Sequence, residues 1–260
     1  MPESSIGKKL RKALRLPAPS APPPAAGTGL LAHSELEFDL QQGVVLRALT
    51  GSTDPKGVCL ALSGAWLKEK RTRTNGSFSA ALDLVGLDRK FHVTNVTEDR
   101  EKKIVTAATE RQNAYEKSGG TANDRLDRLL RESGMRYDPG LSAAMEDCVR
   151  QHPDPGDWRP VTDIALTFTS ATSDACLPEG RGVCIAVDVD GRGHAVAAYR
   201  SRGGSLHFFD PNLGVFKVGN PAGFFAEWVA RYAASGKTLA VTPKGTPENA
   251  TEPRTFTCVR

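Results

Sequence analysis

Cys59 is the residue of this sequence whose type and setting best suit covalent chemistry. Asp54 can act as a helix N-cap and Pro55 favours the first helical position, so we expect a helix over about residues 57–69 with Cys59 in its opening turns. The free amides and the dipole at a helix N-terminus stabilise an anion, which lowers the pKa of a thiol. The sequence therefore predicts a thiolate nucleophile, although a single cysteine on a helix is more often an inert packing residue.

His194 and Asp210 are expected to meet across a β-hairpin. The turn is predicted at residues 201–204, because its two glycines suit the positive φ angles of a tight turn. In an antiparallel hairpin centred there, His194 lies across from Asp210 or Pro211. A carboxylate that accepts a hydrogen bond from a histidine fixes its tautomer and raises its basicity. A chance cross-strand polar pair is the competing interpretation, and Asn212 is a rival for the orienting role.

The order along the chain is cysteine, histidine, aspartate, with Cys59 on an early helix and His194 and Asp210 on a late sheet. Papain-like cysteine proteases have this order, and their active cleft lies between a helical half and a sheet half. His207 is a weaker candidate for the base, because it lies inside a predicted strand and away from the strand end that carries His194. The sequence therefore favours His194.

The elements that position these residues indicate the α+β class. Helices are predicted at about residues 57–69, 98–117, 122–133 and 222–234, and strands at about residues 182–190, 195–199, 206–209 and 239–242. Helices followed by an antiparallel sheet are typical of α+β proteins. Together with the order of the three candidate residues, this pattern predicts a papain-like cysteine protease fold in which a helical half precedes a central antiparallel sheet.

The chain divides into a flexible tail, residues 1–29, and a catalytic domain, residues 30–260. The tail ends in LPAPSAPPPAAGTG, which cannot hold a helix or bury apolar surface. Residues 5–16 place apolar side chains at helical spacing among basic ones, which would suit an anionic membrane or a secretion chaperone, but a disordered charged tail is favoured. The net charge of +4 is concentrated in this tail, so we expect no nucleic-acid binding by the domain.

The five cysteines are an odd number without a Cys-x-x-Cys pair, which argues against a disulfide framework and a structural metal. We expect free thiols in a reducing compartment and no metal or organic cofactor. Neither a bilayer-spanning segment nor the apolar block of a secretory signal peptide is present in the sequence. The folded part is therefore expected to be soluble, and we also expect a monomer.

Two stretches of the sequence resemble the YopT/AvrPphB-type family of bacterial effector cysteine proteases. They are GVCLAL with the tryptophan that follows, and GHAV followed by FFDPNLGVF, of which the FDPNLG block is the most specific. The resemblance covers about residues 57–66 and 182–218. It implies that Cys59 stands in the place of the nucleophile, His194 in that of the base and Asp210 in that of the third member.

The family resemblance also implies a setting. It implies secretion by a type III system into the cytosol of a eukaryotic host cell, where the substrate is a host protein. Membrane contact is expected only through the tail, and the second residue, Pro2, excludes direct N-terminal myristoylation. Two alternative functions stay open: acyl transfer by the same triad, as in a transglutaminase or deamidase, and a non-catalytic binding domain on this fold.

One position departs from the family pattern. Members are expected to place a side-chain amide a few residues before the cysteine as an oxyanion-hole donor, but Asp54 stands near that place. A carboxylate accepts hydrogen bonds and would repel a developing oxyanion. Thr53, Ser52 and the backbone N–H of Cys59 are the other candidate donors.

Overall fold

The computed structural model describes most of the predicted catalytic domain. The described residues are 32–38, 40–51, 57–72, 98–117, 135–150, 161–190, 192–241 and 256–259, with isolated positions between 119 and 131. The predicted tail lies outside them, as do Ser52, Thr53 and Asp54. No helix in the described part of the chain is long and apolar enough to cross a membrane.

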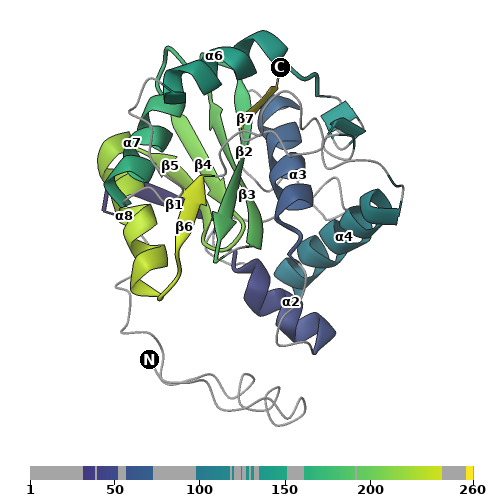
Figure 1. The fold of residues 1–260 in the computed structure, drawn as a ribbon. Coiled ribbons are helices and arrows are strands. Elements are labelled where there is room, and N and C mark those ends of the chain that lie inside the picture. Colours follow the sequence, from purple (N-terminus) through teal and green to yellow (C-terminus); the bar gives the residue numbers. More distant parts are fainter. Residues whose placement is uncertain are drawn as a thin grey trace.

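A central antiparallel sheet is covered by helices on both faces (Figure 1). The strands are β1 (Ser34–Phe38), β2 (Gly182–Val189), β3 (Arg192–Arg200), β4 (Leu206–Asp210), β5 (Gly214–Val218), β6 (Leu239–Val241) and β7 (Phe256–Val259). Their order in the sheet is β1-β5-β4-β3-β2-β6. β6 pairs with the C-terminal end of β2, and β7 pairs with its N-terminal end. The helices are α2 (Gln42–Thr50), α3 (Cys59–Thr72), α4 (Glu98–Lys117), α6 (Pro139–Arg150), α7 (Val161–Ala171) and α8 (Pro221–Ala234).

The sheet separates two hydrophobic cores, because successive side chains of a strand point to opposite faces. Phe209 of β4 and Ala197 of β3 join the core beneath α2, α3 and α4. Phe208 and Ala198, one position away, join the core beneath α6, α7 and α8. Strands with both faces buried read as nearly continuous apolar runs, which explains why β2, β3 and β4 are visible in the sequence.

The β3–β4 hairpin forms where the sequence predicts it, with Gly204 at a φ of 77° in the turn. The predicted register is wrong, however. Ala197 pairs with Phe209, so the position directly across from Asp210 is that of Val196 rather than His194. The cause is the connecting loop, which is one residue longer than the predicted turn. His194 and Asp210 are therefore diagonal neighbours on one face, a spacing that long side chains can bridge.

The turn between β4 and β5 depends on Gly214. This glycine has a φ of 118°, and a Cβ atom there would lie 2.2 Å from the backbone oxygen of Phe38 in β1. Only glycine adopts this conformation at such a close approach without strain. The turn that follows Asp210 therefore packs directly against the first strand of the domain.

The α+β class with a central antiparallel sheet is confirmed, and the structure adds a strand at each end of the predicted order. β1 precedes every described helix and pairs with β5 at the edge of the sheet, and β7 follows the strand predicted to be last. The sequence analysis also missed α2, α6, α7 and β5. Residues predicted as the 122–133 helix are helical at the described positions between 124 and 131.

Candidate active site

Cys59 is the first residue of α3, so it lies even closer to the helix N-terminus than predicted. Val58 acts as the N-cap, because its carbonyl oxygen accepts the first helical hydrogen bond, from Leu62 N, at 3.0 Å. The N–H of Val58 donates to Oε1 of Gln42 at 3.2 Å. Gly57, which precedes the cap, has a low helix propensity. The thiol therefore stands among the first-turn amides that have no partner within the helix.

The environment of Cys59 favours a thiolate. Burial raises the pKa of the thiol, but the hydrogen bond with His194, the attraction to its charge and the backbone N–H groups of Ala195 and Leu60 outweigh burial. The pKa of Cys59 is therefore lower than usual. Burial and the charge on Cys59 raise the pKa of the neighbouring Cys184 to about 12. Of these two thiols, Cys59 is the one that ionises.

His194 joins Cys59 to the sheet side of the site. Its Nε2 lies 2.9 Å from Oδ1 of Asp210, so Nδ1 is the ring nitrogen left to face the thiol. Burial lowers the pKa of His194, but Asp210 and then Cys59 raise it more strongly, to about 10. The imidazole is therefore protonated beside the thiolate at neutral pH.

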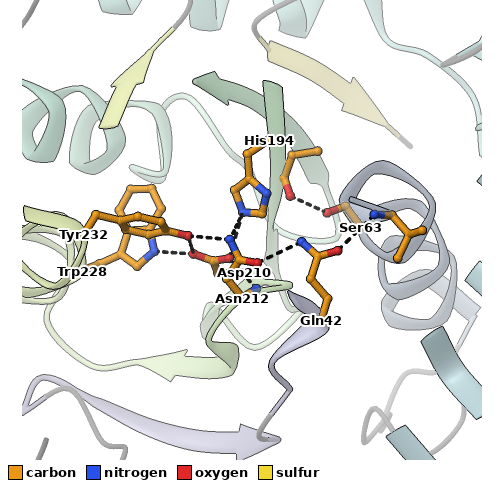
Figure 2. Close-up of polar contacts among 9 residues, drawn as sticks. Gln42, Ser63, His194, Asp210, Asn212, Trp228 and Tyr232 are labelled. Carbon is orange, nitrogen blue, oxygen red and sulfur yellow. Dashed lines mark hydrogen bonds and ion pairs between the residues drawn. The ribbon is translucent and has the colours of Figure 1, made fainter. Parts of the chain in front are cut away.

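Asp210 is held by hydrogen bonds on both carboxylate oxygens and is fully buried (Figure 2). Besides His194, Oδ1 accepts from the backbone N of Asn212 at 2.8 Å. Oδ2 accepts from Trp228 Nε1 at 2.8 Å and from the Tyr232 hydroxyl at 2.7 Å. Burial raises the pKa of Asp210, but His194, Tyr232 and the Asn212 N–H together lower it below its usual value. The carboxylate is therefore charged and fixed in orientation.

α8 supplies two of these donors, which the sequence analysis missed. Asn220 caps the helix, its side chain accepting from Gly223 N, and Pro221 occupies the first turn. Trp228 and Tyr232 are four residues apart, so they lie on one face of the helix. Two aromatic residues with polar tips, four positions apart on a predicted helix, are the sequence pattern that could have indicated these donors.

The two rival residues of the sequence analysis have other positions. Asn212 does not replace Asp210 but lies beside it: its Nδ2 donates to the Tyr232 hydroxyl at 3.2 Å and lies 3.5 Å from His194 Nε2. His207 Nδ1 lies 3.0 Å from Glu37 Oε2 and 3.3 Å from Lys70 Nζ. The structure thus brings Cys59 together with His194 and Asp210, and it places His207 in a separate polar cluster.

The chain matches the peptidase family C58, described as Yersinia/Haemophilus virulence surface antigen, over residues 33–242. The protein belongs to this family of cysteine peptidases. A crystal structure of the Pseudomonas avirulence protein AvrPphB is similar with 14% sequence identity and a TM-score of 0.42, over 72% of this chain and 92% of that chain. A search of curated proteins found no significant match.

The described geometry brings a thiol, an imidazole and a carboxylate into contact, but it does not define an oxyanion hole. The candidate donors before Cys59 lie outside the described residues. The four cysteines whose side chains are described are buried free thiols. Within the same part of the chain, no group of three or more histidine, cysteine or acidic side chains is placed to hold a metal ion.

Proposed function

We propose that the protein is a cysteine endopeptidase with Cys59 as nucleophile, His194 as acid and base, and Asp210 as the residue that orients the histidine. The observation that carries the proposal is the continuous polar contact from Cys59 through His194 to Asp210 at the start of α3. Membership of a cysteine peptidase family supports it. The hydrogen bonds on both oxygens of Asp210 support a preorganised site rather than a chance pair.

The geometry leads to a two-step mechanism. The Cys59 thiolate attacks the scissile carbonyl carbon, and protonated His194 then transfers its Nδ1 proton to the departing amine, which leaves a thioester on sulfur. Neutral His194 next removes a proton from water, whose oxygen attacks the thioester. The acid product leaves, and the thiolate–imidazolium pair is restored. Asp210 holds the ring throughout, so that Nδ1 faces the reacting atoms.

The setting proposed for this activity is the cytosol of a host cell, reached by type III secretion. The description of the family as a virulence antigen supports an effector role. Free thiols fit a reducing compartment. In this proposal the basic, Pro-rich tail serves secretion, chaperone binding or membrane contact, and the substrate is a host protein.

The test compares N-terminal peptides of host-cell proteins after delivery of wild-type protein, Cys59→Ala and Cys184→Ala. Cys184 is a matched control, because it is also a buried free thiol of the same core. We expect new protein N-termini with wild type and Cys184→Ala and none with Cys59→Ala. A mass shift or a crosslink without new N-termini would instead indicate acyl transfer, and a cellular effect that persists in Cys59→Ala would indicate a binding domain.

A further inference from the structure

Gln42 makes three long-range hydrogen bonds and is 4% exposed. As the first residue of α2, it donates its backbone N–H to the Pro211 oxygen at 2.9 Å. Its side-chain Nε2 donates to Asn212 Oδ1 at 3.0 Å, and its Oε1 accepts from Val58 N at 3.2 Å. Gln42 therefore lies between the β4–β5 turn and the start of α3, as Figure 2 shows.

The first consequence concerns the helix that carries Cys59. The N–H of Val58 is one of the amides that have no partner within α3. In a capping box, a glutamate or glutamine of the same helix accepts from the N-cap N–H. Here Gln42 accepts it from another helix. Val58 is 2% exposed, so loss of this acceptor would leave a buried unpaired amide directly before the nucleophile.

The second consequence concerns the side chain of Asn212. Since its Oδ1 accepts from Gln42, its Nδ2 faces the Tyr232 hydroxyl. If the amide were reversed, its oxygen would face that hydroxyl and compete with Asp210 for the proton. The Gln42 amide therefore keeps the Tyr232 hydrogen bond directed to Asp210.

We infer that Gln42 is a positioning residue that couples the two halves of the site, fixing the start of α3 before Cys59 and the orientation of Asn212 behind Asp210. The importance of this role for catalysis rests on the proposed function. The effect of Gln42 on the thiolate–imidazolium pair can be measured without any substrate. A second contact, from Ser63 Oγ to the Ala195 oxygen at 3.1 Å, ties α3 to β3 one turn further along.

The test follows the pH dependence of Cys59 alkylation by iodoacetamide, quantified on the Cys59 peptide. Gln42→Met keeps the side-chain length but removes both side-chain hydrogen bonds. We expect alkylation at neutral pH to slow by about tenfold and the inflection of its pH profile to move to higher pH. The loss of one buried hydrogen bond changes an equilibrium constant by about tenfold. Asn212→Ala should move the profile in the same direction. The double variant should lose less than the product of the two single effects, because the two residues share one hydrogen bond.

Ser142→Ala is the matched control. Ser142 is buried, its hydroxyl donates to the Asp138 oxygen and accepts from Cys258 N, and it lies on α6, at the opposite end of the sheet from α2 (Figure 1). It should lower the melting temperature and leave the alkylation profile unchanged. If Gln42→Met also lowers the melting temperature and leaves the alkylation profile unchanged, Gln42 has only a structural role and the inference is overturned.

A second variant covers the case in which Gln42→Met does not fold. Gln42→Asn retains the amide but is one methylene too short to reach Val58 and Asn212 together, and it should shift the profile in the same direction. An unchanged profile in both Gln42→Asn and Asn212→Ala would also overturn the inference. A profile that depends on Gln42 in a protein that cleaves nothing would leave the inference standing and reject the proposed peptidase.

Discussion

Two of the described histidine–carboxylate pairs have a histidine on a strand of the sheet, and they differ in ways that bear on function. His194 is 2.9 Å from Asp210, with side-chain exposures of 6% and 0%. His207 is 3.0 Å from Glu37, with exposures of 12% and 26%. Lys70 Nζ also lies 3.2 Å from Glu37, whereas the described salt-bridge partner of Asp210 is His194. Distance alone therefore does not distinguish the two pairs.

The difference lies in what surrounds each pair. Asp210 receives hydrogen bonds from two buried aromatic side chains and a backbone amide, and its histidine contacts a thiol. Glu37 shares its charge with a lysine that also lies over the ring of Trp66, 5.7 Å from its centroid. The first environment directs one proton toward a nucleophile, whereas the second neutralises charge at the end of α3. A histidine beside a carboxylate is thus an incomplete signal for catalysis.

The largest difference should come from replacing each of the two histidines by glutamine. His194→Gln removes the acid and base and should lower the rate of cleavage by about 10²–10⁴-fold or more. His207→Gln should leave the rate close to that of wild type, because His207 contacts Glu37 and Lys70. Rates would be measured on the substrate that the host-cell comparison identifies. Equal losses in the two variants would remove the distinction between the pairs.

The next effect concerns charge and pH. Asp210→Asn removes the group that raises the pKa of His194, while the burial that lowers this pKa remains. The pKa of His194 should fall, and the Cys59 thiolate should then form only at higher pH, with a loss of rate approaching that of the histidine variant. Glu37→Gln should leave the alkylation profile of Cys59 unchanged.

The pH dependence of folding stability tests the direction of the His194 pKa shift. The wild-type folded pKa of His194, about 10, lies above its usual 6.5. Its contribution to stability is therefore complete below about 6.5 and is lost as the pH rises toward 10. Melting temperatures of wild type and Asp210→Asn should differ most just below pH 6.5 and converge as the pH rises toward 10. A difference that grows with alkaline pH would contradict the assigned cause of the pKa shift.

The sequence predicted the parts of the site that depend on local signals. A cysteine near a helix start and a hairpin with a glycine turn are short-range patterns, and they led to Cys59, His194 and Asp210. The contact of Gln42 with Asn212 spans 170 positions, and no local pattern indicates it. Trp228 and Tyr232 read as ordinary core aromatics until the fold shows that their polar atoms face Asp210.

The missed elements have a similar explanation. α7 contains three threonines, a valine and an isoleucine, whose β-branched side chains lower helix propensity. The packing of Phe168 against Phe225 and Trp228 of α8 offsets this. β1 is short, and its partner β5 lies far along the chain. Tertiary contacts rather than local propensity therefore decide these elements.

The smallest effects should come from trimming one supporting group beside each carboxylate. Tyr232→Phe deletes one donor to Asp210 and keeps the ring, and Trp228 still donates to the same oxygen. Because the hydroxyl lowers the pKa of Asp210, the variant should raise this pKa toward its usual 3.8. The stability that ionised Asp210 contributes is lost as the pH falls through its folded pKa, so acid unfolding should begin at a higher pH. The lost hydrogen bond to a charged group should cost about 1.5–3 kcal/mol at neutral pH.

Lys70→Met is the counterpart for the second pair. It removes one of the cations that lower the pKa of Glu37, but His207 remains, and the carboxylate is partly exposed to water. Acid unfolding should therefore shift in the same direction and by less than in Tyr232→Phe. Acid titrations followed by circular dichroism would rank the two shifts. Since Tyr232 supports Asp210 and Lys70 does not, only Tyr232→Phe should also slow peptide cleavage, and a comparable slowing by Lys70→Met would mean that the second cluster contributes to the site.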